Sequence, residues 1–336
     1  MRDDHNILYV DNYELITDQN NKRFSISKIE YPKLWNLYKT QQNSFWKMEE
    51  IDFSKDLHSF NKLNNDEQYV IKMILGFFSN LDGIVNFNIS SVLLNKITIL
   101  EASITYNFQM MMENIHNETY AMMLNTIITD TVERDFLFNS IKTIPSITRM
   151  ANWAMKWIDD KIDIGTNLIA YVCVEGILFS SSFATIFWLK HYKSELFPAS
   201  SGLFKSNEFI SNDEKLHYEF GIELYSMVNN KLSIERITEI IIEAVDISKD
   251  FSNNAIKCKL IGMNSSIMNN YIEYVADDII VKLGYKKIFN TPNPFIFMDM
   301  LGMSQRTNFH ESRPTEYSSA YDHKHIRDNT VDDDDF

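Results

Sequence analysis

Two Glu-x-x-His pairs are the residues of this 336-residue chain whose types and spacing could do chemistry. Glu113 and His116 form the first pair, in the segment MMENIHNETY, and Glu214 and His217 form the second, in SNDEKLHYEF. On a helix, residues three and four apart share one face, so Tyr120 falls within about 60° of the first pair. Each segment therefore predicts a carboxylate and an imidazole on one helical face, and the first adds a phenol.

Two further carboxylates interrupt apolar stripes with helical spacing. Asp82 follows Phe78 by four residues in one stripe, and Glu175 follows Val172 by three in another. An unpaired carboxylate is costly to bury, and neighbouring carboxylates also repel one another. Scattered surface charges on amphipathic helices are the simpler alternative, but the residues that flank each carboxylate are apolar. The pattern therefore predicts four inward-facing carboxylates and two imidazoles.

Bound metal ions would offset the cost of burying these groups. One carboxylate from each of two helices, with Glu-x-x-His from each of two others, is the ligand arrangement of ferritin-like di-iron and di-manganese bundles. Oxygen-rich ligation with one imidazole per metal favours iron or manganese over zinc or copper. The residues thus predict an all-α, ferritin-like helical bundle with a dinuclear metal–carboxylate core.

The helices that must carry these residues follow from composition and periodicity. Gly (9) and Pro (6) are scarce, which favours few, long helices, and strand signals are weak apart from short pieces near the N-terminus. Asn64 or Asn65 is expected to cap the helix of Asp82. Helices are expected over residues 31–45, from the cap at Asn64 or Asn65 to residue 89, and over 98–127, 131–142, 150–160, 167–189 and 207–228, with two more in 233–285.

Three regions are expected along the chain. Residues 1–30 look irregular and polar, and residues 31–308 hold the helical bundle. Residues 309–336 are polar and lack apolar periodicity, so they are expected to form a flexible C-terminal tail.

Charge and cysteine content exclude several classes of protein. The net charge of −14, without a cluster of Lys or Arg, speaks against nucleic-acid binding. Cys173 and Cys258 offer neither a disulfide framework nor a zinc motif, and the start MRDDHNILYV lacks signal-peptide features, so a cytoplasmic location is expected. The apolar run 167–189 could span a membrane, but Glu175 near its centre favours a buried helix of a bundle and no membrane.

With all four helices in view, the chain resembles the small, radical-generating subunit of class I ribonucleotide reductase, most of all its eukaryotic and viral branch. The resemblance covers about residues 25–310 and the tail. Asp82, where ferritins and di-iron oxygenases have Glu, favours the reductase branch. The segments that carry the resemblance are SFWKMEEIDFSKD, LDGIVNFN, MMENIHNETY, WAMKWIDDK, VEGILFSSSFATIFWLK, SNDEKLHYEF, KLIGMN, YIEYVAD, NPFIFMDM and TNFHESRPTEY.

The resemblance implies a ligand set and a cofactor. Two iron ions, or manganese, would be held with bridging carboxylates between them, and oxygen would activate the centre. The implied ligands of one metal are Asp82, Glu113 and His116. The implied ligands of the other are Glu175, Glu214 and His217.

Tyr120 matches the tyrosine that is oxidised to a stable radical. Its implied apolar pocket consists of Phe179, Phe183 and Ile210. A long-lived radical needs such a pocket because water and reductants must be kept away.

The resemblance also implies a route for the radical. Trp46 would hydrogen-bond Asp213, which would orient His116, a role that carboxylates often have beside metal-bound histidines. Without the resemblance, the simpler interpretations are favoured, with Trp46 as a packing residue and Asp213 as a surface acid beside Glu214. The tail would dock on the large catalytic subunit, where Tyr317, or else Tyr321, would carry the oxidation onward, so that ribonucleotides become deoxyribonucleotides.

Several positions depart from the family pattern, which leaves alternatives open. Asn212 and Ser103 stand where Arg is usual, Phe87 replaces a Glu, and Thr330 replaces an apolar tail anchor, although the terminal Phe336 matches one. One alternative is an auxiliary subunit in a heteromeric small-subunit dimer, although auxiliary subunits typically lose ligands. Another is an iron-storage or oxygenase bundle. The resemblance implies a dimer, either homodimer or heterodimer.

Overall fold

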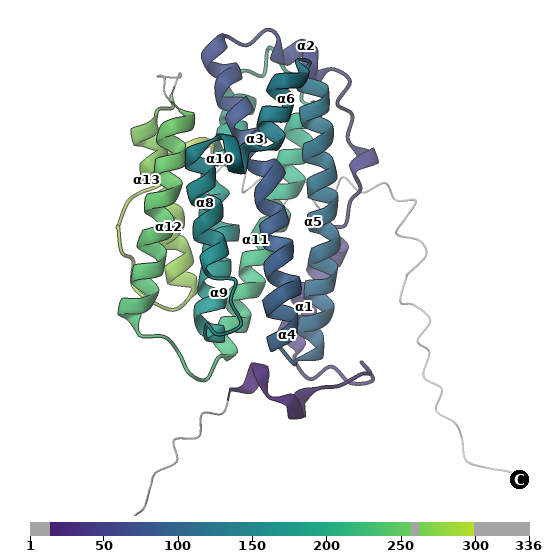
Figure 1. The fold of residues 1–336 in the computed structure, drawn as a ribbon, viewed down its shortest axis with the longest axis vertical. Helices are drawn as coiled ribbons and strands as arrows, with labels where there is room; N and C mark the ends of the chain where they lie inside the picture. The colour runs from purple at the N-terminus through teal and green to yellow at the C-terminus, as the bar shows by residue number, and fades with distance from the viewer. Residues whose placement is uncertain (1–13, 257–261, 299–336) are drawn as a thin grey trace, which may run out of the picture. The chain divides into compact units, whose positions relative to one another are not determined.

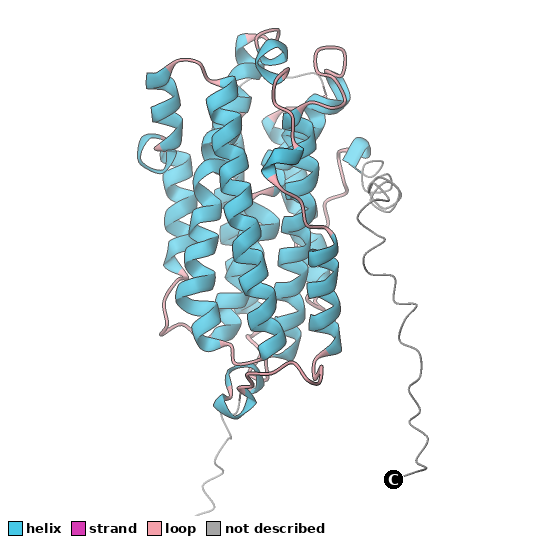
Figure 2. Ribbon diagram, turned by 90° about the vertical axis from the view of Figure 1, so that its right-hand side faces the viewer, coloured by secondary structure: helices cyan, strands magenta, loops and turns pink. Residues whose placement is uncertain are grey.

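The computed structural model describes residues 14–256 and 262–298. Every regular element in these ranges is helical, as Figure 2 shows. The weak strand signals near the N-terminus do not lead to a strand in residues 14–30, which are irregular apart from two 3-10 helices, Leu15–Thr17 and Gln19–Asn21. The α-helices are α1 (Pro32–Asn43), α2 (Asp56–Phe60), α3 (Asn65–Asn88), α4 (Leu94–Lys96), α5 (Leu100–Ile127), α6 (Thr131–Phe138), α7 (Ser140–Thr143), α8 (Pro145–Lys156), α9 (Ile164–Cys173), α10 (Ser180–Tyr192), α11 (Gly202–Met227), α12 (Ile234–Ala255) and α13 (Ser265–Lys282).

Four long helices form the centre of the bundle. Helix α3 packs along α5, α9 packs along α11, and α5 also contacts α11, so that these helices run side by side in Figure 1. Helices α8 and α13 pack on α12, which in turn contacts α9. This compact unit, Met1–Pro294, is separate from a second unit that begins at Phe295. The bundle was expected to end at residue 308, and residues 299–308 lie outside the described ranges.

Local side-chain chemistry sets where the helices begin. Asn64 caps α3, as expected: its Oδ1 accepts from the Glu67 N–H at 2.9 Å, and Glu67 Oε2 accepts from the Asn64 N–H at 3.1 Å. Asp163 caps α9 in the same manner, accepting from the Thr166 N–H at 2.8 Å. The caps fix the register of the two helices that carry Asp82 and lead to Glu175.

Several expected helices have different bounds in the structure, and α11, for example, begins at Gly202 and not at residue 207. The single helix over 131–142 is wrong, because the chain leaves helical geometry at Asn139 and starts again as α7, where the Ser140 hydroxyl donates to the Gly76 carbonyl oxygen at 2.5 Å. The helix expected over 150–160 begins earlier, at Pro145, and ends at Lys156. Proline suits the first turn of a helix because its missing N–H would have no partner there.

The irregular N-terminal segment is held on the start of α5. The buried Glu101 carboxylate accepts from Arg23 Nη2 at 2.6 Å and from the Glu30 N–H at 2.8 Å. The Thr98 N–H donates to the Ile16 carbonyl oxygen at 2.9 Å. Although burial alone would raise the pKa of Glu101, the hydrogen bond from Arg23 keeps it below its ordinary value.

A turn of π-helix, Val174–Leu178, joins α9 to α10. Such turns add a residue to the helix and often occur at functional sites, and this one contains Glu175. The runs Asn65–Lys96 and Ile164–Tyr192 are long and apolar enough to cross a membrane. The apolar window of the second is wholly buried by neighbouring helices, as expected for the central helix of a bundle.

Candidate metal centre

The carboxylates and imidazoles predicted from the sequence converge inside the bundle. Asp82 comes from α3, Glu175 from the π-helical turn, and the two Glu-x-x-His pairs from α5 and α11. All of these side chains are at most 2% exposed. Their donor atoms form two groups, and within each group the atoms lie within 4.8 Å of one another. The His116 group is Asp82, Glu113, His116 and Glu214. The His217 group is Glu113, Glu175, Glu214 and His217.

Two of the carboxylates belong to both groups. His116 Nδ1 lies 3.2 Å from Glu113 Oε2 and 3.1 Å from Glu214 Oε1. His217 Nδ1 lies 3.0 Å from Glu113 Oε1 and 3.2 Å from Glu214 Oε2. Glu113 and Glu214 thus each present one oxygen to each histidine, which is the position of a bridging carboxylate. Asp82 and Glu175 each belong to one group.

The donor set fits cations, because several oxygens have no other partner. Both oxygens of Asp82 and Oε2 of Glu175 are buried and have no hydrogen-bond partner among the described residues. Burial, and then the charges of Glu113 and Glu214, raise the pKa of Asp82 well above its ordinary value. Burial and the facing Glu214 carboxylate do the same to the pKa of Glu175. Positive charge between the groups would offset both causes, because it stabilises the ionised form of each carboxylate.

A hydrogen-bonded line joins Trp46 to His116 through one carboxylate oxygen of Asp213. Trp46 Nε1 donates to Asp213 Oδ2 at 2.7 Å, and His116 Nε2 lies 3.1 Å from the same oxygen. The indole also stacks on the imidazole, with ring centroids 5.8 Å apart. Burial opposes a charge on His116, but the hydrogen bonds to Asp213 and the glutamates raise its pKa well above the ordinary value. The structure brings this predicted pair together, and its role in radical transfer stays a prediction.

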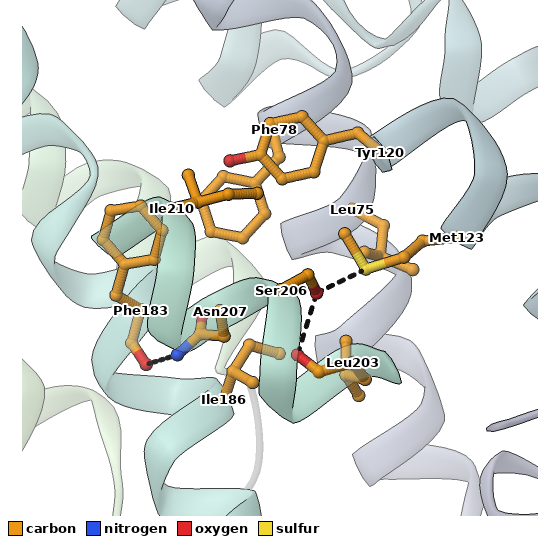
Figure 3. Close-up of a pocket in the computed structure, with 10 residues that line it drawn as sticks. All are labelled: Leu75, Phe78, Tyr120, Met123, Phe183, Ile186, Leu203, Ser206, Asn207 and Ile210. Carbon is orange, nitrogen blue, oxygen red and sulfur yellow. Dashed lines mark hydrogen bonds between the residues drawn. The ribbon is translucent and has the colours of Figure 1, made fainter. Parts of the chain in front are cut away.

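Tyr120 lies in an apolar, closed environment. Its side chain is 1% exposed, and its hydroxyl has no hydrogen-bond partner among the described residues. A small cavity of about 10 Å³ lies beside the ring. It is also lined by Phe183 and Ile210, which Figure 3 shows with the ring. Phe78 stacks on the Tyr120 ring at a centroid distance of 4.8 Å. Phe179 does not line this cavity and packs behind Phe78, 6.1 Å away. The sequence pattern places Phe78 on the apolar stripe of α3 but does not identify it as a residue of the pocket.

Sequence reasoning missed two polar residues beside the His217 group. Gln109 Nε2 donates to Glu175 Oε1 at 2.9 Å and to Glu113 Oε1 at 3.1 Å. The Tyr171 hydroxyl donates to Gln109 Oε1 at 2.7 Å. Gln109 precedes Glu113 by four residues and Tyr171 precedes Glu175 by four. This spacing of one helical turn was the signal that could have identified them.

The comparison with known families agrees with this geometry. Residues 23–294 match the family model described as the small chain of ribonucleotide reductase. This chain belongs to that family. The resemblance inferred from the sequence segments is therefore confirmed, as is the all-α, ferritin-like fold.

Relatives of this small chain come from viruses and fungi. The ribonucleoside-diphosphate reductase small chain of Vaccinia virus (strain Ankara) is 46% identical over 304 residues, which cover 90% of this chain and 94% of the relative. The small chain of Neurospora crassa is 47% identical over 309 residues, which cover 91% of this chain and 74% of the relative.

Solved structures of other reductase subunits share the fold. The Rnr4 homodimer of Saccharomyces cerevisiae superposes with a TM-score of 0.77 at 30% identity, covering 88% of this chain and 92% of the other. The dimanganese(II)-NrdF of Streptococcus sanguinis gives 0.73 at 17% identity, covering 83% and 98%, and supports the fold alone. Family and donor cluster together support a dimetal centre in this small chain. The predicted tail residues Tyr317, Thr330 and Phe336 lie outside the described residues.

Proposed function

We propose that this small chain provides the radical for a ribonucleoside-diphosphate reductase, whose large subunit reduces ribonucleotides to deoxyribonucleotides. The observation that carries the proposal is the convergence of two buried donor groups that share Glu113 and Glu214. A buried phenol with no hydrogen-bond partner, Tyr120, lies one helical turn from His116. The names of the relatives support the same reaction.

The residues would divide the work of holding two metals. Glu113 and Glu214 would bridge them, while Asp82 with His116 and Glu175 with His217 would each complete one site. Iron is the proposed metal and manganese the alternative, because the donors are carboxylates with one imidazole for each metal. When bound, the metals with oxygen supply a one-electron oxidant.

The protein's own contribution at Tyr120 is exclusion of water and retention of the phenol proton. Burial, and then the nearby Asp82 and Glu214 charges, raise the pKa of Tyr120 well above its ordinary value. The hydroxyl therefore keeps its proton until the ring loses an electron. The rings of Phe78 and Phe183 leave only the small cavity beside it.

The route to the large subunit would start at the line formed by His116, Asp213 and Trp46. Bonds of 3.1 and 2.7 Å connect these residues, and they support the proposed relay. Residues 309–336 would dock on the large subunit, with Tyr317 as the next carrier. We also propose a homodimer in the cytoplasm. The auxiliary role in a heterodimer is motivated by Asn212 and Thr330, whereas the complete donor set favours an active subunit.

Electron paramagnetic resonance of protein reconstituted with ferrous iron and oxygen tests the proposal. We expect a tyrosyl signal in the wild type and in Tyr106→Phe, a matched change of another buried phenol on α5. Tyr120→Phe should bind two metals and show no signal. A signal that survives in Tyr120→Phe would assign the radical elsewhere.

Nucleotide reduction separates this function from iron storage or oxygenase chemistry. With the large subunit present, we expect deoxynucleotide formation that stops when residues 309–336 are removed. Iron uptake without any nucleotide reduction would favour the storage alternative, and activity that needs a second, different small chain would favour the auxiliary one.

A further inference from the structure

We infer that Gln109, held in place by Tyr171, is a positioning residue for the His217 group, so that the two metals occupy sites with different polar supports. The inference deepens the proposed function and rests on it. Gln109 lies on α5 and Tyr171 on α9, and both side chains are at most 1% exposed.

The Gln109 amide is hydrogen-bonded at both its nitrogen and its oxygen. Its nitrogen donates one bond to Glu175 and one to Glu113, at 2.9 and 3.1 Å, and its oxygen accepts from Tyr171 at 2.7 Å. With metal bound, these carboxylates are ionised and only accept hydrogen bonds, so the amide nitrogen faces them and the amide oxygen faces the phenol. Tyr171 therefore determines the orientation in which Gln109 meets the two carboxylates.

Both carboxylate contacts of Gln109 lie on the side of His217. The amide bonds Glu113 Oε1, the oxygen 3.0 Å from His217 Nδ1, whereas Glu113 Oε2 faces His116. Glu175 belongs to the His217 group alone. Its Oε1 takes the amide bond, and its buried Oε2 has no partner among the described residues. One oxygen of Glu175 is thus fixed by the protein and the other is free for a cation.

The Tyr171 ring has little freedom to move. A Cβ built on Gly221 of α11 would lie 2.9 Å from the ring, which therefore packs directly against the backbone of that helix. Tyr106 meets the ring edge-on at a centroid distance of 6.0 Å. The Tyr171 hydroxyl also lies 3.5 Å from the His217 carbonyl oxygen. A Phe at this position would keep the packing and lose only the hydroxyl.

Binding of Mn²⁺ alone to metal-free, full-length protein tests the inference, with free Mn²⁺ counted by electron paramagnetic resonance. In an Asp82→Ala background, which leaves the His217 group complete, Tyr171→Phe should weaken binding by about tenfold and Gln109→Met by up to about 100-fold, as outer partners of ligands do. In a His217→Ala background, which leaves the His116 group complete, the same changes should alter affinity by no more than about twofold. Tyr106→Phe is the matched control and should change neither affinity.

The outcomes separate this inference from the proposed function. Equal weakening of both groups, or an effect of Tyr171→Phe no larger than that of Tyr106→Phe, would overturn the positioning role and leave the dimetal centre intact. A wild type that binds fewer than two Mn²⁺ would overturn both. Circular dichroism checks folding, and if Gln109→Met does not fold, the milder Tyr171→Phe decides.

Discussion

The two histidines of the metal centre are supported in different ways. On the side of His116, a carboxylate, Asp213, bonds the imidazole and is itself bonded by the Trp46 indole. On the side of His217, a neutral amide, Gln109, bonds the carboxylates and is itself bonded by the Tyr171 phenol. The Asp213 support is charged and bonds the histidine ring, whereas the Gln109 support is neutral and bonds the carboxylates.

This difference indicates a division of labour. Asp213 adds negative charge beside an imidazole, which favours positive charge on that side and suits a route for oxidation. Gln109 adds no charge and donates to oxygens that must stay ionised, which suits the holding of a metal. The variants described next test whether the supports on the two sides differ in this way.

The largest expected effect is the loss of turnover in Trp46→Phe. Phe keeps an aromatic ring against His116 but removes the N–H that bonds Asp213. We expect nucleotide reduction with the large subunit to fall by at least about 100-fold, at the upper end for such outer partners. Product formation measures the effect, and metal content should stay unchanged.

Tyr171→Phe is the corresponding change on the side of His217, since it removes the hydroxyl that bonds Gln109. With saturating metal it should retain most of the turnover, because its hydroxyl bonds Gln109 and does not lie on the line from His116 to Trp46. If both variants lost turnover to the same degree, the proposed division of labour would be wrong.

Metal removal should make stability depend on pH in a defined direction. Burial opposes protonation of His217, but the Glu113 and Glu214 charges raise its pKa from 6.5 to about 9 in the metal-free protein. The folded state then holds this proton more tightly than the unfolded state. The resulting stability is fully present below pH 6.5 and is lost as pH rises through about 9. The raised pKa values of Asp82 and Glu175 act in the same direction, because the folded state also holds these protons more tightly than the unfolded state.

Denaturation of chelated and metal-loaded protein measures this effect. From pH 6.5 to 9 the free energy of unfolding of the chelated protein should fall by up to about 3 kcal/mol. The stabilisation by metal should grow over the same range, since metal ligands must be deprotonated. A chelated protein whose stability rises toward pH 9 would contradict the crowded-carboxylate picture.

The sequence predicted one part of this centre better than the other. Asp82 and Glu175 could be found because a carboxylate in an apolar stripe is conspicuous, and the histidines because their spacing repeats. Gln109 and Tyr171 are ordinary residues of a helix core, and their spacing of one helical turn from Glu113 and Glu175 becomes informative only once these glutamates are known to belong to one group. The assignment of Glu113 and Glu214 to both groups likewise depends on which oxygen faces which histidine, and helical periodicity carries no such information.

Asp213→Asn should convert the charged support into a neutral one. We expect about tenfold weaker Mn²⁺ binding by the His116 group, because the imidazole loses a partner that makes it a better ligand. The measurement uses the His217→Ala background. The His217 group, measured in the Asp82→Ala background, should be unaffected, and an equal loss there would show that Asp213 supports the whole centre.

The smallest effect separates two neighbouring phenols. Tyr171 and Tyr106 are both buried and in edge contact, but only the Tyr171 hydroxyl has a hydrogen-bond partner among the described residues. Leaving a buried hydroxyl without a partner is unfavourable, so Tyr106→Phe should stabilise the fold by up to about 1 kcal/mol, whereas Tyr171→Phe should destabilise it by about 1 kcal/mol. Urea denaturation of both variants measures whether each change raises or lowers the free energy of unfolding. A destabilised Tyr106→Phe would contradict the expectation that the Tyr106 hydroxyl has no partner, and the difference between the two phenols would be lost.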